Sequence, residues 1–169
     1  LWYGTPFSRD ELLLKLRHVE PNKTFRETWQ YQNLMFMTAG ILIERLSGQS
    51  WEDFTRKQIF EPLGMQESNF SVEKLKTHSN AALPYRYDDD AEKQIQMDYR
   101  NIDAIGPAGS INSSAEDMLK WIAFQLNQGQ VDDQEIISSG DFAFMHSPQM
   151  LMPGGPRYDE RSAMSYGLG

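Results

Sequence analysis

Tyr31 and Asn33 stand two residues apart, directly before a long apolar run, and their side chains are of types that can do chemistry. A phenol can hold or pass on a proton, and a carboxamide can hydrogen-bond to a substrate amide. A free phenol has a pKa near 10, so it acts as a base at neutral pH only where neighbouring cations favour the phenolate. Tyr31 would therefore need a lysine partner. Without one, the simpler interpretation makes Tyr31 a residue at the edge of the core and Asn33 a helix cap.

Ser71 and Lys74 match the spacing Ser-x-x-Lys. On a helix this spacing places a hydroxyl and an amine on one face, where the amine can activate the hydroxyl. A pattern with two fixed positions also arises by chance, and a serine at a helix start is explained by capping. We therefore interpret Ser71 as a cap.

The remaining titratable residues predict no metal site and no cofactor. The three histidines are isolated from one another and have no metal-ligand spacing, so we interpret each as a surface or packing residue: His18, His78 and His146. The acidic run at 88–90 is interpreted as a solvated turn, because Ca²⁺ needs six or more oxygens from several directions. No Gly-x-Ser-x-Gly, His-Glu-x-x-His or phosphate-binding glycine loop occurs.

The run from Leu34 to Leu46 must position the Tyr31 and Asn33 pair. One threonine, one glutamate and one arginine interrupt it, so a helix here is apolar nearly all round and is expected inside the molecule. Asn33 is the expected N-cap, and the partial positive charge of a helix start favours nearby anions. Gly48 is suited to the left-handed conformation that ends a helix.

Shorter elements are expected around this central helix. Capping signals and apolar periodicity predict helices over 8–19, 50–60, 71–75, from a cap at Ser113 or Ser114 to 128, and over 141–146. Alternation predicts a hairpin that pairs 82–87 with 95–99. The fourth of these helices is expected to bury an apolar stripe formed by Met118, Leu119, Ile122 and Leu126. A Pro/Gly-rich loop is expected over 148–156, and residues 166–169 resemble the start of a strand. The fold class predicted is mainly α with a small β-hairpin.

Size and composition narrow the function further. The chain has 169 residues, which is the length of a single domain. Its 24 acidic and 16 basic residues give a net charge of −8, which argues against a nucleic-acid partner. The absence of cysteine excludes disulfides and thiolate chemistry, and the longest apolar run is shorter than the roughly 20 residues of a membrane span. Because the chain begins with Leu and carries no signal-like segment, we expect it to be an excised piece.

Three blocks of the sequence resemble the class C β-lactamase-related serine hydrolases, which include penicillin-binding peptidases and esterases. These blocks are residues 31–48, residues 59–65, and Pro-Ala-Gly-Ser at 107–110 with Ser-Ser-Ala-Glu-Asp-Met at 113–118; the resemblance extends to Tyr-Gly-Leu-Gly at 166–169. In that family a Ser-x-x-Lys provides the nucleophile, a Tyr-x-Asn provides a base and a substrate-holding asparagine, and a later His- or Lys-x-Gly lines the opposite wall. Tyr31 and Asn33 match the second motif. The other two motifs are expected outside the chain, because Ser71 lies on the wrong side of Tyr31.

The resemblance also implies an architecture. The family fold is α+β, an antiparallel sheet with helices on its faces plus a helical subdomain, and residues 1–169 are expected to form that helical region as a single segment. An apolar face left bare by the missing sheet would invite self-association. The chain departs from the sequence pattern of this family at two points. It lacks the usual Pro-Gly before Tyr31, and it has Gln32 in place of a small residue.

The resemblance implies acyl transfer on a small-molecule or peptide substrate, such as a β-lactam, an amide or an ester, without a cofactor. Because the nucleophile is expected elsewhere, the isolated chain is expected to be inactive. A periplasmic or secreted location is suggested by the resemblance only. The alternative is a non-catalytic helical module that binds a ligand or a partner.

Overall fold

The computed structural model describes residues 2–152 and 164–168. Its helical elements are α1 (Arg9–Leu16), α2 (Asn33–Ser47), α3 (Trp51–Thr55), the π-helix η1 (Arg56–Phe60), α4 (Glu61–Leu63), α5 (Val72–Leu75), the 3₁₀ segment η2 (Asp103–Ala108), α6 (Ala115–Leu126) and α7 (Ser139–Met145). The strands are β1 (Tyr85–Asp88), β2 (Lys93–Gln96), β3 (Gln130–Val131), β4 (Gln134–Glu135), β5 (Met150–Leu151) and β6 (Ser165–Tyr166). The described part is therefore mainly helical, as the sequence predicts.

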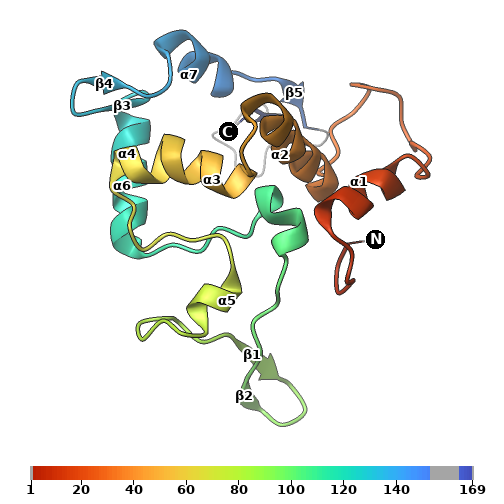
Figure 1. Cartoon of the computed structure of the whole chain (residues 1–169). Helices are drawn as coiled ribbons and strands as arrows, with labels where there is room; N and C mark the ends of the chain where they lie inside the picture. Colours follow the sequence, from red (N-terminus) through yellow and green to blue (C-terminus); the bar gives the residue numbers. More distant parts are fainter. Residues whose placement is uncertain (1, 153–163, 169) are drawn as a thin grey trace.

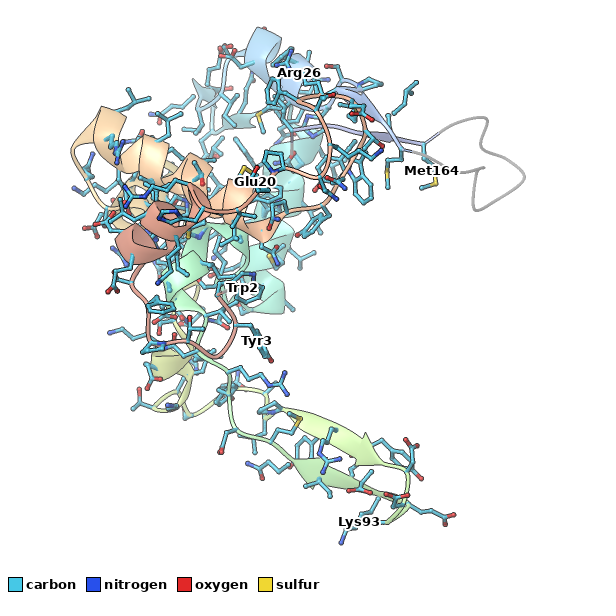
Figure 2. The ribbon with its side chains drawn as sticks, turned by 90° about the vertical axis from the view of Figure 1, so that its right-hand side faces the viewer. Trp2, Tyr3, Glu20, Arg26, Lys93 and Met164 are labelled. Atoms are coloured by element: carbon cyan, nitrogen blue, oxygen red, sulfur yellow. The ribbon has the colours of Figure 1, made fainter. Side chains whose placement is uncertain are left out.

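Helix α2 lies near the middle of the molecule and packs mainly on η2, and the hairpin β1–β2 extends away from the helices (Figure 1). In the side view Lys93 marks the tip of this hairpin, while Arg26 and Met164 lie at the opposite end (Figure 2). The hairpin pairs Tyr85 with Gln96 and Asp88 with Lys93. Two shorter antiparallel pairs, β3–β4 and β5–β6, are additions to the single hairpin that the sequence predicts.

Two apolar clusters hold the helices together. The first joins α1, α2 and η2 through Leu12, Leu34, Met37, Ile41 and Ile105. The second joins the α3–η1–α4 segment to α6 through Trp51, Phe60, Leu63, Met65, Phe70 and Phe124. Leu12 and Met37 are fully buried, so the inner face of α2 forms part of the first core, as its apolar run predicts.

The helix ends confirm some capping signals and correct others. Ser8 and Glu11 form the predicted capping box of α1, although the helix ends at Leu16. Gly48 closes α2 with φ 69°, as predicted. The prediction of Asn33 as the cap is wrong. Gln32 is the N-cap and its side-chain oxygen accepts from the backbone N–H of Leu34 at 3.2 Å, so the cap lies one residue earlier.

The predicted helix over 50–60 continues through Pro62 to Leu63. Proline has no N–H and its ring crowds the carbonyl four residues earlier, and the turn before it is widened: the N–H of Glu61 donates to the carbonyl of Arg56, five residues back. This π-helical turn was not predicted. Gly64, with φ 68°, then ends α4. The predicted loop over 148–156 falls partly outside the described residues.

The expectation that α2 is buried all round is wrong, because Leu42 is 56% exposed and Leu46 is 80% exposed. The stripe predicted for α6 is wrong in the same way: its four apolar residues are exposed, and Asp117 and Phe124 point inward instead. Among the described residues no layer covers these apolar side chains of α2 and α6. Among the described residues no helix combines the length and the apolar character that a membrane crossing requires.

The inward face of α6 carries a buried carboxylate. Asp117 accepts hydrogen bonds from the Glu67 N–H at 2.9 Å, the Ser68 hydroxyl at 2.8 Å and the Lys120 ammonium at 3.0 Å. Burial alone would raise the pKa of Asp117, but these donors outweigh it and lower that pKa below its ordinary value. The charged carboxylate of Asp117 therefore links α6 to the 67–68 loop through hydrogen bonds.

Candidate functional site

Tyr31 lies at the end of the extended segment that enters α2. The next residue, Gln32, is extended, with φ −145° and ψ 105°, and the helix starts immediately after it. The Tyr31 ring packs against Phe36 of the first turn with 5.9 Å between ring centroids. Its side chain is 56% exposed, so the phenol stands on an open surface rather than in the core.

A pocket of about 520 Å³ opens beside this ring. Its described walls are Tyr31 and Phe36 from the entrance of α2, Pro107 and Ala108 from η2, and residues 165–168 from the chain's last segment. None of these described side chains is charged, in a chain whose net charge is −8. Such a pocket favours an uncharged group.

The last segment reaches this pocket through the pairing of β5 with β6. The Gln149 N–H donates to the Tyr166 carbonyl, and the Leu168 N–H donates to the Met145 carbonyl, each at 2.9 Å. The Tyr166 ring also packs near Trp29, with 5.9 Å between centroids. These contacts bring a segment distant in sequence to the entrance of α2.

A second pocket, of about 270 Å³, shares Tyr31, Phe36 and Tyr166 with the first. Its one charged lining residue among those described is Arg26. The Arg26 guanidinium stacks over the Phe25 ring at 5.2 Å. No lysine lines either of these two pockets within the described residues. Lys23 lines a further pocket that Tyr31 also borders, and no contact between Lys23 and the Tyr31 phenol is found among the described residues.

Asn33 is the first residue of α2 and is half-buried. It is not among the described residues that line the two pockets. The structure thus brings Tyr31 to a pocket wall, with Asn33 set back along the helix. The roles of both residues in catalysis stay predictions.

The part of the pocket wall formed by Pro107 and Ala108 is held close to α2 by a glycine. A Cβ added at Gly40 would lie 2.7 Å from the Cβ of Pro107, and closer still to its Cγ. Ordinary carbon contacts lie at about 3.5–4.0 Å. The Pro107 ring therefore packs directly on the backbone of α2, and this contact sets the position of the wall relative to Tyr31.

Ser71 behaves as the cap it was interpreted to be. Its hydroxyl accepts from the Glu73 N–H at 3.2 Å and donates to the Asp103 carboxylate at 2.7 Å. Lys74 is exposed. His78 forms an exposed pair with Glu67 at 2.8 Å, and the described residues contain no group of three or more potential metal ligands.

One charged cluster behind the wall was not predicted from the sequence. Arg9 of α1 pairs with Glu44 of α2 and with Glu52 of α3, each at 2.6 Å. The available signal was Glu44 itself, a charge within an apolar helix. A buried charge requires a partner, but the sequence did not identify Arg9 as that partner.

Comparison with solved structures places this arrangement in a known fold. The chain superposes on an octameric penicillin-binding protein homologue from Pyrococcus abyssi with a TM-score of 0.73 and 23% identity, covering 95% of this chain and 34% of that one. A likeness at this identity shows the fold, which is that of the β-lactamase and penicillin-binding protein structures. The sequence resemblance to these hydrolases is thus confirmed at the level of fold.

The family follows from the sequence match. The β-lactamase family profile matches residues 2–168, and the chain belongs to the β-lactamase family. It is 27% identical over 151 residues to an unguisins hydrolase of Aspergillus campestris, covering 89% of this chain and 28% of that protein. It is 28% identical over 161 residues to a penicillin-binding protein of Bacillus subtilis, covering 90% and 32%. The chain thus spans about a third of the length of these relatives.

Proposed function

We propose that residues 1–169 form the helical segment of a serine hydrolase that acts by acyl transfer on amide, β-lactam or ester substrates. The observation that carries this proposal is the exposed phenol of Tyr31 on a pocket wall, at the entrance of α2, in a chain of the β-lactamase family. The names of the two curated relatives, a hydrolase and a penicillin-binding protein, support the same reaction class. The chain covers about a third of each relative, and the proposal assigns the nucleophile and the sheet to segments outside it.

In the proposed reaction a serine hydroxyl attacks the substrate carbonyl, and Tyr31, kept basic by a lysine, takes up the hydroxyl proton. Tyr31 then gives that proton to the leaving nitrogen or oxygen as the acyl-enzyme forms. Water releases the acyl group by the reverse proton transfers. Asn33 hydrogen-bonds to the substrate amide, which requires its carboxamide to reach beyond the start of α2.

The pocket beside Tyr31 supports a preference in the substrate. Pro107, Phe36 and the other described lining residues carry no charge, so the group next to the scissile carbonyl is expected to be uncharged. The bare faces of α2 and α6 are assigned to packing against the sheet of the longer protein. In its absence these faces favour self-association of the chain.

The test is Tyr31→Phe in the full-length protein. General acid–base catalysis contributes about 10²–10⁴-fold, so kcat for an ester or amide substrate should fall by that factor. Removing one exposed oxygen should leave Tm unchanged. Tyr85→Phe is the matched control, because Tyr85 is exposed to a similar extent, 53% against 56%, but lies on the hairpin.

An unchanged kcat in Tyr31→Phe, with the control also unchanged, would remove Tyr31 from the mechanism. A full-length protein that binds penicillin or a peptide without hydrolysing it would favour the alternative, a non-catalytic binding module. Loss of Tm together with loss of rate would assign Tyr31 to packing.

A further inference from the structure

One arginine side chain ties four segments of the molecule together. Arg9 Nη1 donates to Glu44 Oε1 and Arg9 Nη2 donates to Glu52 Oε1, each at 2.6 Å. Nη2 also donates to the carbonyl of Asp103 at 3.2 Å, and Nε donates to the carbonyl of Ala104 at 3.4 Å. The guanidinium therefore links α1 to α2, α3 and η2.

This cluster is largely shielded from water. The side chain of Arg9 is 14% exposed, and those of Glu44 and Glu52 are 27% and 29% exposed. Burial alone would lower the pKa of Arg9, but the hydrogen bonds and charges of Glu52 and Glu44 raise it above its ordinary value. Removing the cation would leave two half-buried carboxylates facing each other, and such uncompensated charge is strongly unfavourable.

The cluster lies directly behind the pocket wall. The two carbonyls that Arg9 binds belong to η2, the segment that ends in Pro107 and Ala108. A Cβ added at Gly106 would lie 2.9 Å from Arg9 Nη2, so the backbone of η2 rests against the guanidinium. With Pro107 packed on Gly40, η2 is held between the guanidinium and α2.

We propose that Arg9 is a positioning residue, which holds the Pro107–Ala108 wall at the distance from Tyr31 that the substrate requires. The inference rests on the proposed function and extends it to a residue outside the pocket. Arginine is suited to this position because its planar guanidinium group donates hydrogen bonds to several acceptors at once. The lysine ammonium is a compact charge and does not reproduce this planar arrangement of N–H donors.

The experiment compares Arg9→Lys and Arg9→Met with Arg56→Met in the full-length protein. Arg56 pairs with Asp53 at the same 2.6 Å, but that pair is exposed on α3 and η1. Misplacement of a substrate by about 1 Å can cost about 10²-fold in rate. We expect kcat/KM to fall by about that factor in both Arg9 variants, through kcat as well as KM, and to stay unchanged in Arg56→Met.

A purely structural role is separated by a stability control. Asp117→Asn removes the buried carboxylate that links α6 to the 67–68 loop, next to the second apolar cluster. This variant should lower Tm without changing KM in the folded fraction. If Arg9→Lys and Arg9→Met lower Tm but keep the KM of the parent protein in the folded fraction, the positioning role is overturned. In Gly106→Ala the added methyl group would lie 2.9 Å from Arg9 Nη2, 3.1 Å from Ser110 Oγ and 3.3 Å from Glu52 Oε1. This variant disturbs the same cluster, should raise KM more mildly, and covers the case in which Arg9→Met does not fold.

Hydrogen exchange gives a readout that does not depend on activity. The N–H groups of Gly109 and Ser110 both donate to the Gly106 carbonyl at 3.0 Å. They should exchange faster in Arg9→Lys and not in Arg56→Met. A protein without hydrolase activity would refute the proposed function but leave this difference intact, whereas equal exchange in both variants would refute the positioning role alone.

Discussion

Replacing Gly40 with alanine tests how tightly α2 and η2 are packed. An added methyl group would lie 2.7 Å from the Cβ of Pro107 and closer still to its Cγ, which is about 1 Å or more inside an ordinary carbon contact. Overpacking of this kind costs about 1–3 kcal/mol. The gain in helix propensity from glycine to alanine offsets about 0.5–1 kcal/mol of that cost. We therefore expect Gly40→Ala to lose about 0.5–2 kcal/mol of unfolding free energy.

The control is Gly140→Ala, since Gly140 is also helical, in α7, and a Cβ there meets nothing within 4 Å. This variant should be as stable as the parent chain or slightly more stable. Urea unfolding followed by circular dichroism measures both, and each kcal/mol corresponds to about 2–4 °C in Tm for a chain of this size. Equal stabilisation by the two substitutions would show that Pro107 does not press on Gly40. The account of how the pocket wall is positioned would then be wrong.

Three further outcomes follow from the structure. The pKa of Asp117 is lowered in the folded chain, so its contribution to the unfolding free energy is complete above the ordinary carboxyl pKa of about 4 and is lost as pH falls through the lowered value. The stability difference between the parent chain and Asp117→Asn, measured by urea unfolding, should thus shrink at acidic pH; a constant difference would contradict this. The isolated chain should form no covalent adduct with a fluorescent penicillin or fluorophosphonate, and an adduct on Ser71 in mass spectrometry would overturn its interpretation as a cap. Sedimentation should show association that increases with concentration and weakens when Leu46, which is 80% exposed, is replaced by Glu; a monomer at all concentrations would refute it.

Local signals identified the elements that carry the pocket. The apolar run after Tyr31 and the glycine at 48 predicted α2 to within one or two residues. Both signals are local, because a helix and its C-terminal glycine are determined by residues that are close in sequence. The capping box at Ser8 was found for the same reason. For α6 the sequence left two candidate caps, Ser113 and Ser114, and the structure uses Ser114. The cap of α2 was missed because both Gln32 and Asn33 offer a side-chain oxygen at the helix entrance, and the backbone path chooses between them.

The contacts that position the wall were beyond local signals. Arg9 lies 35 positions from Glu44 and 43 positions from Glu52, and no periodicity connects residues so far apart. No role was predicted for Gly40, and in the structure its lack of a side chain admits the Pro107 ring. Such roles depend on which segments meet in three dimensions, and a single sequence does not record that.

The exposed faces of α2 and α6 explain why burial was predicted less well than the elements. Periodicity identifies apolar residues but does not show which layer covers them, and α6 has apolar residues on both sides. In this chain Phe124 faces the α3–α4 segment and is 2% exposed, whereas Leu119, on the other side, is 65% exposed. Leu42 and Leu46 give α2 the same two-sided character. Helices that are apolar on both sides are expected between two layers, and the described chain supplies one of them. Helices α2 and α6 each carry a second apolar surface that could pack against another layer. This surface is the reason why burial was predicted wrongly, and it is also the reason for proposing a sheet that covers these helices.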